Sequence, residues 1–225
     1  MRKDKLFKIK FILFFTLNSF AQSNGAKYWL DPEGNEVNHH IMELVKKYLD
    51  NSMGFKKTID SGLIFQFNNP KYETFQVEYS YLKKELEEIT YKTYNDSTVF
   101  LISFFYLDDT CSDWHSNKMT RSLISSLKEK IYNGKGKFEK NNIKLICLFE
   151  NGITLQNTIE NQKEYFYSDS NSFFRKNLFL HPSLCGSFGL IKPNGQTLIR
   201  NGEYDIFSMN EHLKPEIWNL IFNKE

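Results

Sequence analysis

Two apolar segments rich in β-forming residues constrain the fold of this chain most strongly. They are "STVFLISFFYL" at 97–107 and "NIKLICLFE" at 142–150. Near-continuous apolar runs of this kind are typical of strands that are buried on both faces of a sheet. Between them, Met119, Leu123 and Leu127 recur every four residues, which predicts a helix over about 111–131. Strand, helix and strand in this order predict a β-α-β unit.

The remainder of the chain after residue 150 continues the alternation. The segment "SDSNSFFRKNLF" at 168–179 predicts a short helix that a Ser or Asp side chain caps. "LIKPNGQTLI" at 190–199 places Pro-Asn-Gly between two apolar strands, which predicts a hairpin. "MNEHLKPEIWNLIF" predicts a terminal helix with a break near Pro215. The expected fold class over 96–225 is therefore α/β, with a central mixed β-sheet flanked by helices.

Residues 23–95 are expected to form a small N-terminal lobe. "KYWLDPEGNEV" at 27–37 has a turn signal between apolar residues, and "NHHIMELVKKYLD" at 38–50 has apolar residues at helical spacing. "SGLIFQF" at 61–67 predicts a short strand, and "YSYLKKELEEI" at 79–89 predicts an amphipathic helix.

Residues 1–22 have the pattern of a signal peptide. A basic segment, "MRKDKLFKIK", precedes the short apolar run "FILFFTLNSF", and small residues follow that suit cleavage near Ala21 and Gln22. A transmembrane anchor is disfavoured because the apolar run is far shorter than the ~20 residues that a membrane span needs. We therefore expect a secreted or periplasmic protein with no integral membrane anchor after cleavage.

The charge of the mature chain argues against a nucleic-acid partner. Residues 1–22 carry five basic side chains and one acidic side chain, a net charge of +4, whereas the whole chain has a formal net charge of +2. The mature part therefore carries about −2 by subtraction, and its sequence has no basic stripe to neutralise phosphates.

Three cysteines are present, Cys111, Cys147 and Cys185. Export would place them in an oxidising compartment, where a disulfide persists. The odd number leaves one thiol unpaired, or paired between chains. Cys147 lies inside an apolar strand, where a cysteine behaves as a small core residue.

The order of elements, with a thiol at the first strand-to-helix turn, resembles the thioredoxin-like superfamily. It is most similar to exported thiol-disulfide oxidoreductases and peroxiredoxins. Three stretches carry the resemblance: "VFLISFFYLDDTC" at 99–111, "IKLICLFE" at 143–150 and "GSFGLIKPNGQTLIRNG" at 186–202. The resemblance implies a thioredoxin-like sandwich, thiol-disulfide exchange, and an exported protein as substrate or partner.

The sequence departs from that family at two positions of the active-site motif. The family has Cys-x-x-Cys, whereas the matching stretch here is "CSDW", so that Cys111 is present and Trp114 stands at the second position. The family also has a cis-proline just before its third buried strand, and Gly186 or Ser187 stands there. Exchange through the usual dithiol motif is therefore excluded.

The resemblance also implies a partner for Cys111. In this fold the active-site turn and the cis-proline loop lie side by side, which places Cys185 beside Cys111. The pair would form a disulfide, either as a fixed staple or as an exchangeable site in which the Cys111 thiolate attacks a substrate disulfide and Cys185 resolves the product.

Two other functions remain open. The first is a redox-inactive binding or structural module, which the missing motif favours. The residues around Cys111 leave its reactivity open. A Thr110 cap would put Cys111 in the first helical turn and stabilise its thiolate, whereas the negative charges of Asp108, Asp109 and Asp113 disfavour a thiolate.

The second is a copper or zinc site. Cys111 and His115 are four residues apart, and thiolate with imidazole suits Cu(I) or zinc. The exported copper-chaperone relatives pair Cys-x-x-x-Cys with a distant histidine, so "CSDWH" with His181 would supply Cys111, His115 and His181 as ligands. Apart from this alternative, no cofactor is expected.

Overall fold

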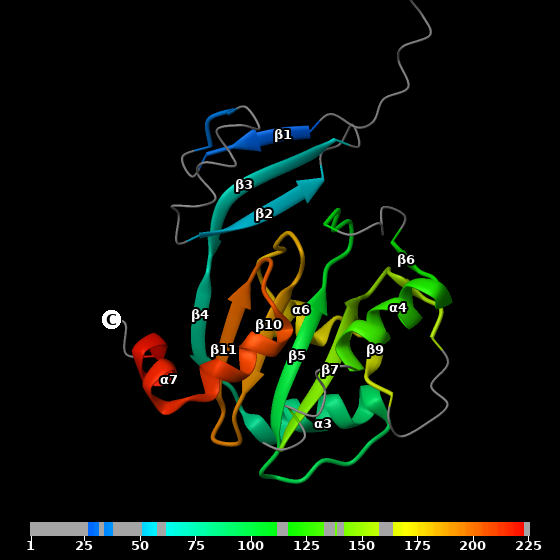
Figure 1. Cartoon of the computed structure of the whole chain (residues 1–225), viewed down its shortest axis with the longest axis vertical. Coiled ribbons are helices and arrows are strands. Elements are labelled where there is room, and N and C mark those ends of the chain that lie inside the picture. The colour runs from blue at the N-terminus through cyan, green and yellow to red at the C-terminus, as the bar shows by residue number, and fades with distance from the viewer. Residues whose placement is uncertain are drawn as a thin grey trace, which may run out of the picture.

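The computed structural model describes residues 27–31, 34–37, 51–57, 62–111, 117–132, 138, 142–157 and 164–222. The expected signal peptide at 1–22 and the expected helix at 38–50 lie outside these residues. The main sheet has six strands in the order β4-β11-β10-β5-β7-β9 (Figure 1). Their bounds are β4 Tyr72–Gln76, β5 Val99–Phe105, β7 Ile143–Glu150, β9 Phe166–Asp169, β10 Ser187–Ile191 and β11 Gln196–Asn201.

The strand directions confirm the expected fold class, a mixed α/β fold with a central mixed sheet flanked by helices. β5 pairs with β7 in parallel, as the predicted β-α-β unit requires, and β9 is parallel to β7. β10 is antiparallel to both β5 and β11, so the predicted hairpin is confirmed. This arrangement is consistent with the thioredoxin-like fold that the sequence resembles.

Helices cover both faces of the central sheet. Alternate residues of β5 divide between two cores, with Leu101 on one face and Phe100 and Ile102 on the other. On the Leu101 side pack α4 (Arg121–Tyr132), the 3-10 helix η1 (Ile206–Leu213) and α7 (Pro215–Phe222). On the Phe100 side pack α3 (Tyr79–Thr90), which confirms the amphipathic helix, and α6 (Phe173–Asn177).

The first crossover helix starts later than the sequence predicts. The sequence predicts a helix from about residue 111, but Cys111 lies in a bend, and α4 begins at Arg121. Thr120 makes the cap, since its side-chain oxygen accepts from the backbone N–H of Leu123 at 3.3 Å. Before it, β6 (Lys118–Met119) pairs with β8 (Thr154–Leu155), which holds this segment extended. The predicted cap at Thr110 is therefore wrong.

The two later helix predictions are confirmed. Asp169 caps α6 by accepting from the backbone N–H groups of Phe174 and Arg175, at 3.3 and 2.9 Å. Lys214 separates η1 from α7, so the break lies just before Pro215.

A second, three-stranded sheet lies above the main one in Figure 1, in the order β1-β3-β2. Its strands are β1 (Lys27–Leu30), β2 (Asn51–Lys57) and β3 (Leu63–Pro70), so the strand predicted at 61–67 is confirmed. Met53 and Phe65 form its small core. β3 leads directly into β4, which joins the central sheet by pairing with β11. The helix α3 that follows β4 packs against one face of the same sheet.

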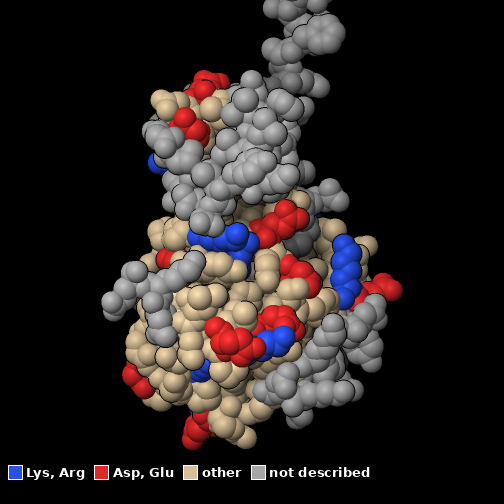
Figure 2. Space-filling model, turned by 60° about the vertical axis from the view of Figure 1, so that its left-hand side comes forward, with Lys and Arg blue, Asp and Glu red and all other residues tan. Residues whose placement is uncertain are grey.

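Charged side chains of both signs occur together on the face that Figure 2 shows. Figure 2 shows acidic and basic residues interspersed on one face of the described molecule. In the part of the chain that the structure describes, no helix is long and apolar enough to span a bilayer.

Candidate functional site

Cys111 and Cys185 are joined in a disulfide, with their Cα atoms 4.8 Å apart. Cys111 lies on the loop that leaves β5, and Cys185 lies two residues before β10. β5 and β10 are antiparallel neighbours with Ser187 opposite Phe104, so the end of one strand and the start of the other meet at one edge of the sheet. The fold thereby brings together two cysteines that are 74 residues apart.

The carboxylate of Asp109 links the two halves of the disulfide. Its Oδ1 accepts the backbone N–H of Cys111 at 2.9 Å and that of Cys185 at 3.2 Å. The residue is only 6% exposed. Burial raises the pKa of Asp109, although these hydrogen bonds, and one from the backbone of Gly186, act in the opposite direction. One buried carboxyl group therefore positions both cysteine backbones.

The turn that carries Cys185 has an unusual backbone. Cys185 has φ of +69° and Gly186 has φ of +80°, both in the left-handed region. The N–H of Gly186 donates to the carbonyl of Ser183 at 3.0 Å and closes the turn. A Cβ atom at position 186 would lie 2.6 Å from the carbonyl oxygen of Phe104. Only glycine fits this close approach, which places the turn against the end of β5.

Buried polar groups run beneath the disulfide loop. The hydroxyl of Tyr106 donates to Ser187 Oγ at 3.0 Å, and Ser187 donates in turn to Asn201 Oδ1 at 2.8 Å. The amide of Asn201 donates to Glu73 Oε1 at 2.6 Å. Burial raises the pKa of Tyr106, so this hydroxyl stays protonated as a donor. These hydrogen bonds tie β4, β10 and β11 to the base of the site.

The three cysteine residues differ in exposure. Cys111 is exposed and Cys185 is partly buried, whereas Cys147 is completely buried. Burial raises the pKa of the Cys147 thiol, which keeps it protonated. A reagent in solution therefore reaches Cys111 most readily, and Cys147 behaves as the core residue that the sequence predicts.

The loop between β5 and Cys111 is fixed by its acidic residue Asp108. The side chains of Asp108 and Asn117 are hydrogen-bonded at 2.9 Å, and Asn117 also accepts the backbone N–H of Asp108 at 2.7 Å. Lys57, at the end of β2, lies 3.3 Å from the Asp108 carboxylate. This ion pair is partly exposed and contributes little to stability, but it brings the ammonium group of Lys57 from β2 to the loop that carries Cys111.

The predicted metal ligands are not assembled among the described residues. His115, like Asp113 and Trp114, lies outside them, and His181 Nε2 lies 3.3 Å from Glu73 Oε2. No group of three His, Cys, Asp or Glu side chains in the described part of the chain could hold a metal ion. A thiolate ligand from Cys111 would require reduction of the disulfide, so a copper or zinc site stays a prediction for the reduced protein.

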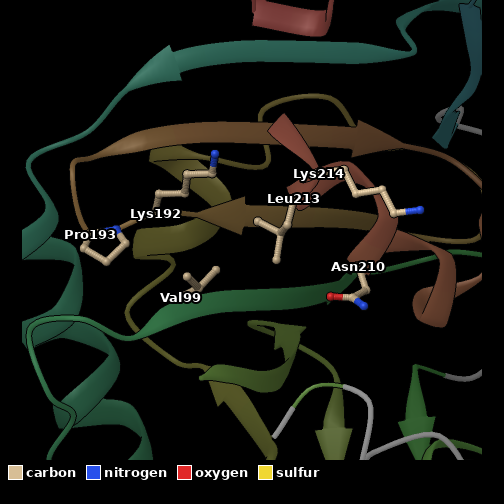
Figure 3. A pocket seen from close by; sticks show the side chains of 6 residues that line it. All are labelled: Val99, Lys192, Pro193, Asn210, Leu213 and Lys214. Atoms are coloured by element: carbon tan, nitrogen blue, oxygen red, sulfur yellow. The ribbon is translucent and has the colours of Figure 1, made fainter. Parts of the chain in front are cut away.

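A separate hollow of about 480 Å³ lies at the opposite end of the sheet. Figure 3 shows its lining, in which Val99 and Leu213 form an apolar floor between Lys192 and Lys214. The Lys192 ammonium lies 3.6 Å from the centre of the Trp218 ring. Because Val99 begins β5 and Cys111 follows the end of β5, this hollow is remote from the disulfide.

Comparisons with known proteins leave the function open. No protein-family model and no curated protein matches the chain. A solved structure that is similar is the N-terminal domain of PilB from Neisseria gonorrhoeae, with 17% identity and a TM-score of 0.34. The alignment covers 56% of this chain and 83% of that chain. A likeness at this level carries no activity from one protein to the other.

The resemblance to the thioredoxin-like superfamily implies the pairing of Cys111 with Cys185, but the sequence does not indicate the role of Asp109. From the sequence, Asp109 is only a negative charge that disfavours a thiolate. Its burial and its bond to Cys185 depend on a contact across 76 residues, for which the sequence "DDTC" gives no local signal.

Proposed function

We propose that the protein is an exported thiol-disulfide exchange protein, in which Cys111–Cys185 is the exchangeable disulfide. The observation that supports this most is the difference between the two cysteines, since Cys111 is exposed and Cys185 is partly buried. In a redox pair, one sulfur must meet the substrate while the other stays behind as leaving and resolving group. The location, secreted or periplasmic, rests on residues 1–22 and on the disulfide.

The exchange proceeds through one mixed disulfide. A substrate thiolate attacks Cys111 Sγ, the bond between Cys111 and Cys185 breaks, and Cys185 leaves as a thiolate. A second substrate thiolate then attacks the substrate sulfur of the mixed disulfide and releases Cys111. The substrate loses two electrons and the protein gains them, with protons taken up as pH and pKa require. In the opposite direction, the Cys111 thiolate attacks a substrate disulfide and Cys185 resolves it.

A redox-inactive binding module is the second candidate, and Asp109 favours it. Its carboxyl group is buried against both cysteine backbones. When it is charged, it disfavours a thiolate at either sulfur. In that case the disulfide would act as a staple, which the loop-closure model values at about 4 kcal/mol for a loop of this length.

Variants that lack one of the two bonded cysteines distinguish these functions. Reduced Cys185→Ser protein is incubated with glutathione disulfide, and the glutathionyl adduct is followed by mass spectrometry. Cys111→Ser is the matched control, because it keeps the partly buried Cys185 and the buried Cys147. We expect Cys185→Ser to form the adduct at least about tenfold faster, since the exposed sulfur is the nucleophile. Equal rates, or no adduct in either variant, would count against the proposal.

A further inference from the structure

The backbone beside Cys185 is already paired with another part of the chain. In β2, the N–H of Phe55 donates to the carbonyl of Pro182 at 3.3 Å, and the N–H of Leu184 donates to the carbonyl of Met53 at 2.8 Å. Gly54 and Ser183 form the antiparallel bridge between these bonds. β2 therefore occupies the strand edge at 182–184, immediately before the disulfide.

Side chains reinforce this pairing. Asn69 donates to the carbonyl of Pro182 and to Ser183 Oγ, both at 2.9 Å, and Ser183 is completely buried. The Phe55 ring packs edge-on against Tyr106, with ring centres 6.4 Å apart. Leu184 packs against the small core of the three-stranded sheet. Hydrogen bonds, buried contacts and aromatic packing all hold β2 on this edge.

Three further backbone groups of this turn are bonded within the protein. The N–H of Cys185 donates to Asp109, that of Gly186 donates to Ser183, and the carbonyl of Gly186 accepts from Gly202. An extended peptide gains its affinity by adding a strand to a free edge. Because the named groups between residues 182 and 186 are committed within the protein, an added peptide strand cannot pair with them.

We infer that the redox partner of Cys111–Cys185 is a low-molecular-mass thiol or its disulfide, not an extended peptide that docks as a strand. This inference rests on the proposed function and narrows its substrate class. A small thiolate needs access only to the sulfur of Cys111, which is an exposed residue. It attacks that sulfur, releases the Cys185 thiolate, and a second molecule of the same thiol resolves the mixed disulfide to give the small-molecule disulfide.

The test compares two thiols on the full mature protein. One is N-acetylcysteine amide, and the other is an unstructured peptide with the same cysteine flanked by valine and threonine residues. The rate at which each thiol reduces Cys111–Cys185 is measured at increasing thiol concentrations and divided by the thiolate concentration. The rate at which the same thiol reduces glutathione disulfide is the reference. We expect the small thiol to reduce Cys111–Cys185 faster than it reduces glutathione disulfide. The peptide should reduce Cys111–Cys185 no faster than the small thiol does, and its rate should not saturate with peptide concentration.

Two results would overturn this inference, and they differ in meaning. The first is a peptide whose rate of reducing Cys111–Cys185 saturates and exceeds that of the small thiol more than about tenfold. A tenfold difference corresponds to about 1.4 kcal/mol of docking energy, and it would refute the small-thiol class while leaving the proposed function standing. If neither thiol reduced Cys111–Cys185 faster than the same thiol reduces glutathione disulfide, both the substrate class and the proposed function would fail.

Variants of Phe55 test the part that β2 plays. N–H groups along a strand point alternately to its two edges, so Phe55→Pro removes the donor to Pro182 while leaving the bonds to β3. Phe55→Ala is the matched control, because it loses the same ring and keeps the N–H. We expect faster reduction by the peptide in Phe55→Pro only, with equal rates for the small thiol. Equal peptide rates in both variants would refute the role of β2, and if Phe55→Pro does not fold, the wild-type comparison decides.

Discussion

Asp109 and Cys185 are 76 residues apart in the sequence, yet the carboxylate of Asp109 accepts the backbone N–H of Cys185 at 3.2 Å. The same oxygen accepts the N–H of Cys111. A third residue therefore links the two loops that carry the disulfide, independently of the bond between the sulfur atoms.

The first prediction concerns the loss of this acceptor. Asp109→Ala removes the acceptor of two partly buried hydrogen bonds, from the N–H groups of Cys111 and Cys185, and an unsatisfied donor costs roughly 1–3 kcal/mol. We expect the free energy of unfolding in urea to fall by about 3 kcal/mol. Asp109→Asn is the control, because its amide oxygen still accepts, and it should retain most of the stability. Equal losses in the two variants would mean that the hydrogen bonds do not matter.

The second prediction is the pH dependence of the same residue. Burial raises the pKa of folded Asp109 above its unfolded value of about 3.9. Its contribution to stability is therefore complete below about pH 3.9 and declines as pH rises through the folded pKa. The stability of the wild type relative to Asp109→Asn should fall with rising pH, as measured by urea unfolding from pH 3 to 8. A difference that increases with pH would indicate a lowered pKa.

The third prediction concerns Gly186. Gly186→Ala brings a Cβ atom to 2.6 Å from the carbonyl oxygen of Phe104 and also strains a backbone with φ of +80°. Gly34→Ala is the control, since it has a similar φ of +90° but its nearest contact is 3.7 Å away. We expect Gly34→Ala to cost about 1 kcal/mol and Gly186→Ala clearly more, by thermal or urea unfolding. Similar losses would show that the turn moves away from β5 freely.

The fourth prediction concerns the hydrogen bond between Tyr106 and Ser187. Ser187→Ala leaves the buried Tyr106 hydroxyl without its acceptor, and it also leaves Asn201 without a donor. We expect a loss of about 1–3 kcal/mol. Adding Tyr106→Phe should cost less in that background than in the wild type, because the partner is already absent. Strictly additive losses in this double-mutant cycle would exclude coupling between the two residues.

The fifth prediction concerns Cys147. Its thiol is completely buried and its pKa is raised, so iodoacetamide should not label the folded, oxidised protein. Labelling should require unfolding, so the folded protein should be labelled about a thousandfold or more slowly than the unfolded protein. Mass spectrometry should then show one label in denaturant and three after reduction. Rapid labelling of the folded protein would show that the core opens at this strand.

The central sheet was predictable because its strands are locally distinctive. The apolar runs that became β5 and β7, and the Pro-Asn-Gly turn between β10 and β11, carry their signal within about ten residues. The same holds for the break before Pro215, since proline cannot continue a helix.

The start of α4 was not predictable in this way. It depends on the pairing of Lys118–Met119 with Thr154–Leu155 and on the bonds between Asp108 and Asn117, which are contacts across the fold. β4 joins the central sheet through β11, more than a hundred residues away, for a similar reason. The pairing of β2 with residues 182–184 is likewise a contact between distant parts of the chain, for which the sequence has no local signal.

The reduction potential of Cys111–Cys185 tests the central claim most directly. The mature protein is equilibrated with a series of glutathione redox buffers, and the oxidised fraction is read by alkylation and mass spectrometry. An exchangeable site predicts a value above about −300 mV, within the range in which biological thiols exchange with it. A value far below about −300 mV would identify a structural staple and contradict the proposed function.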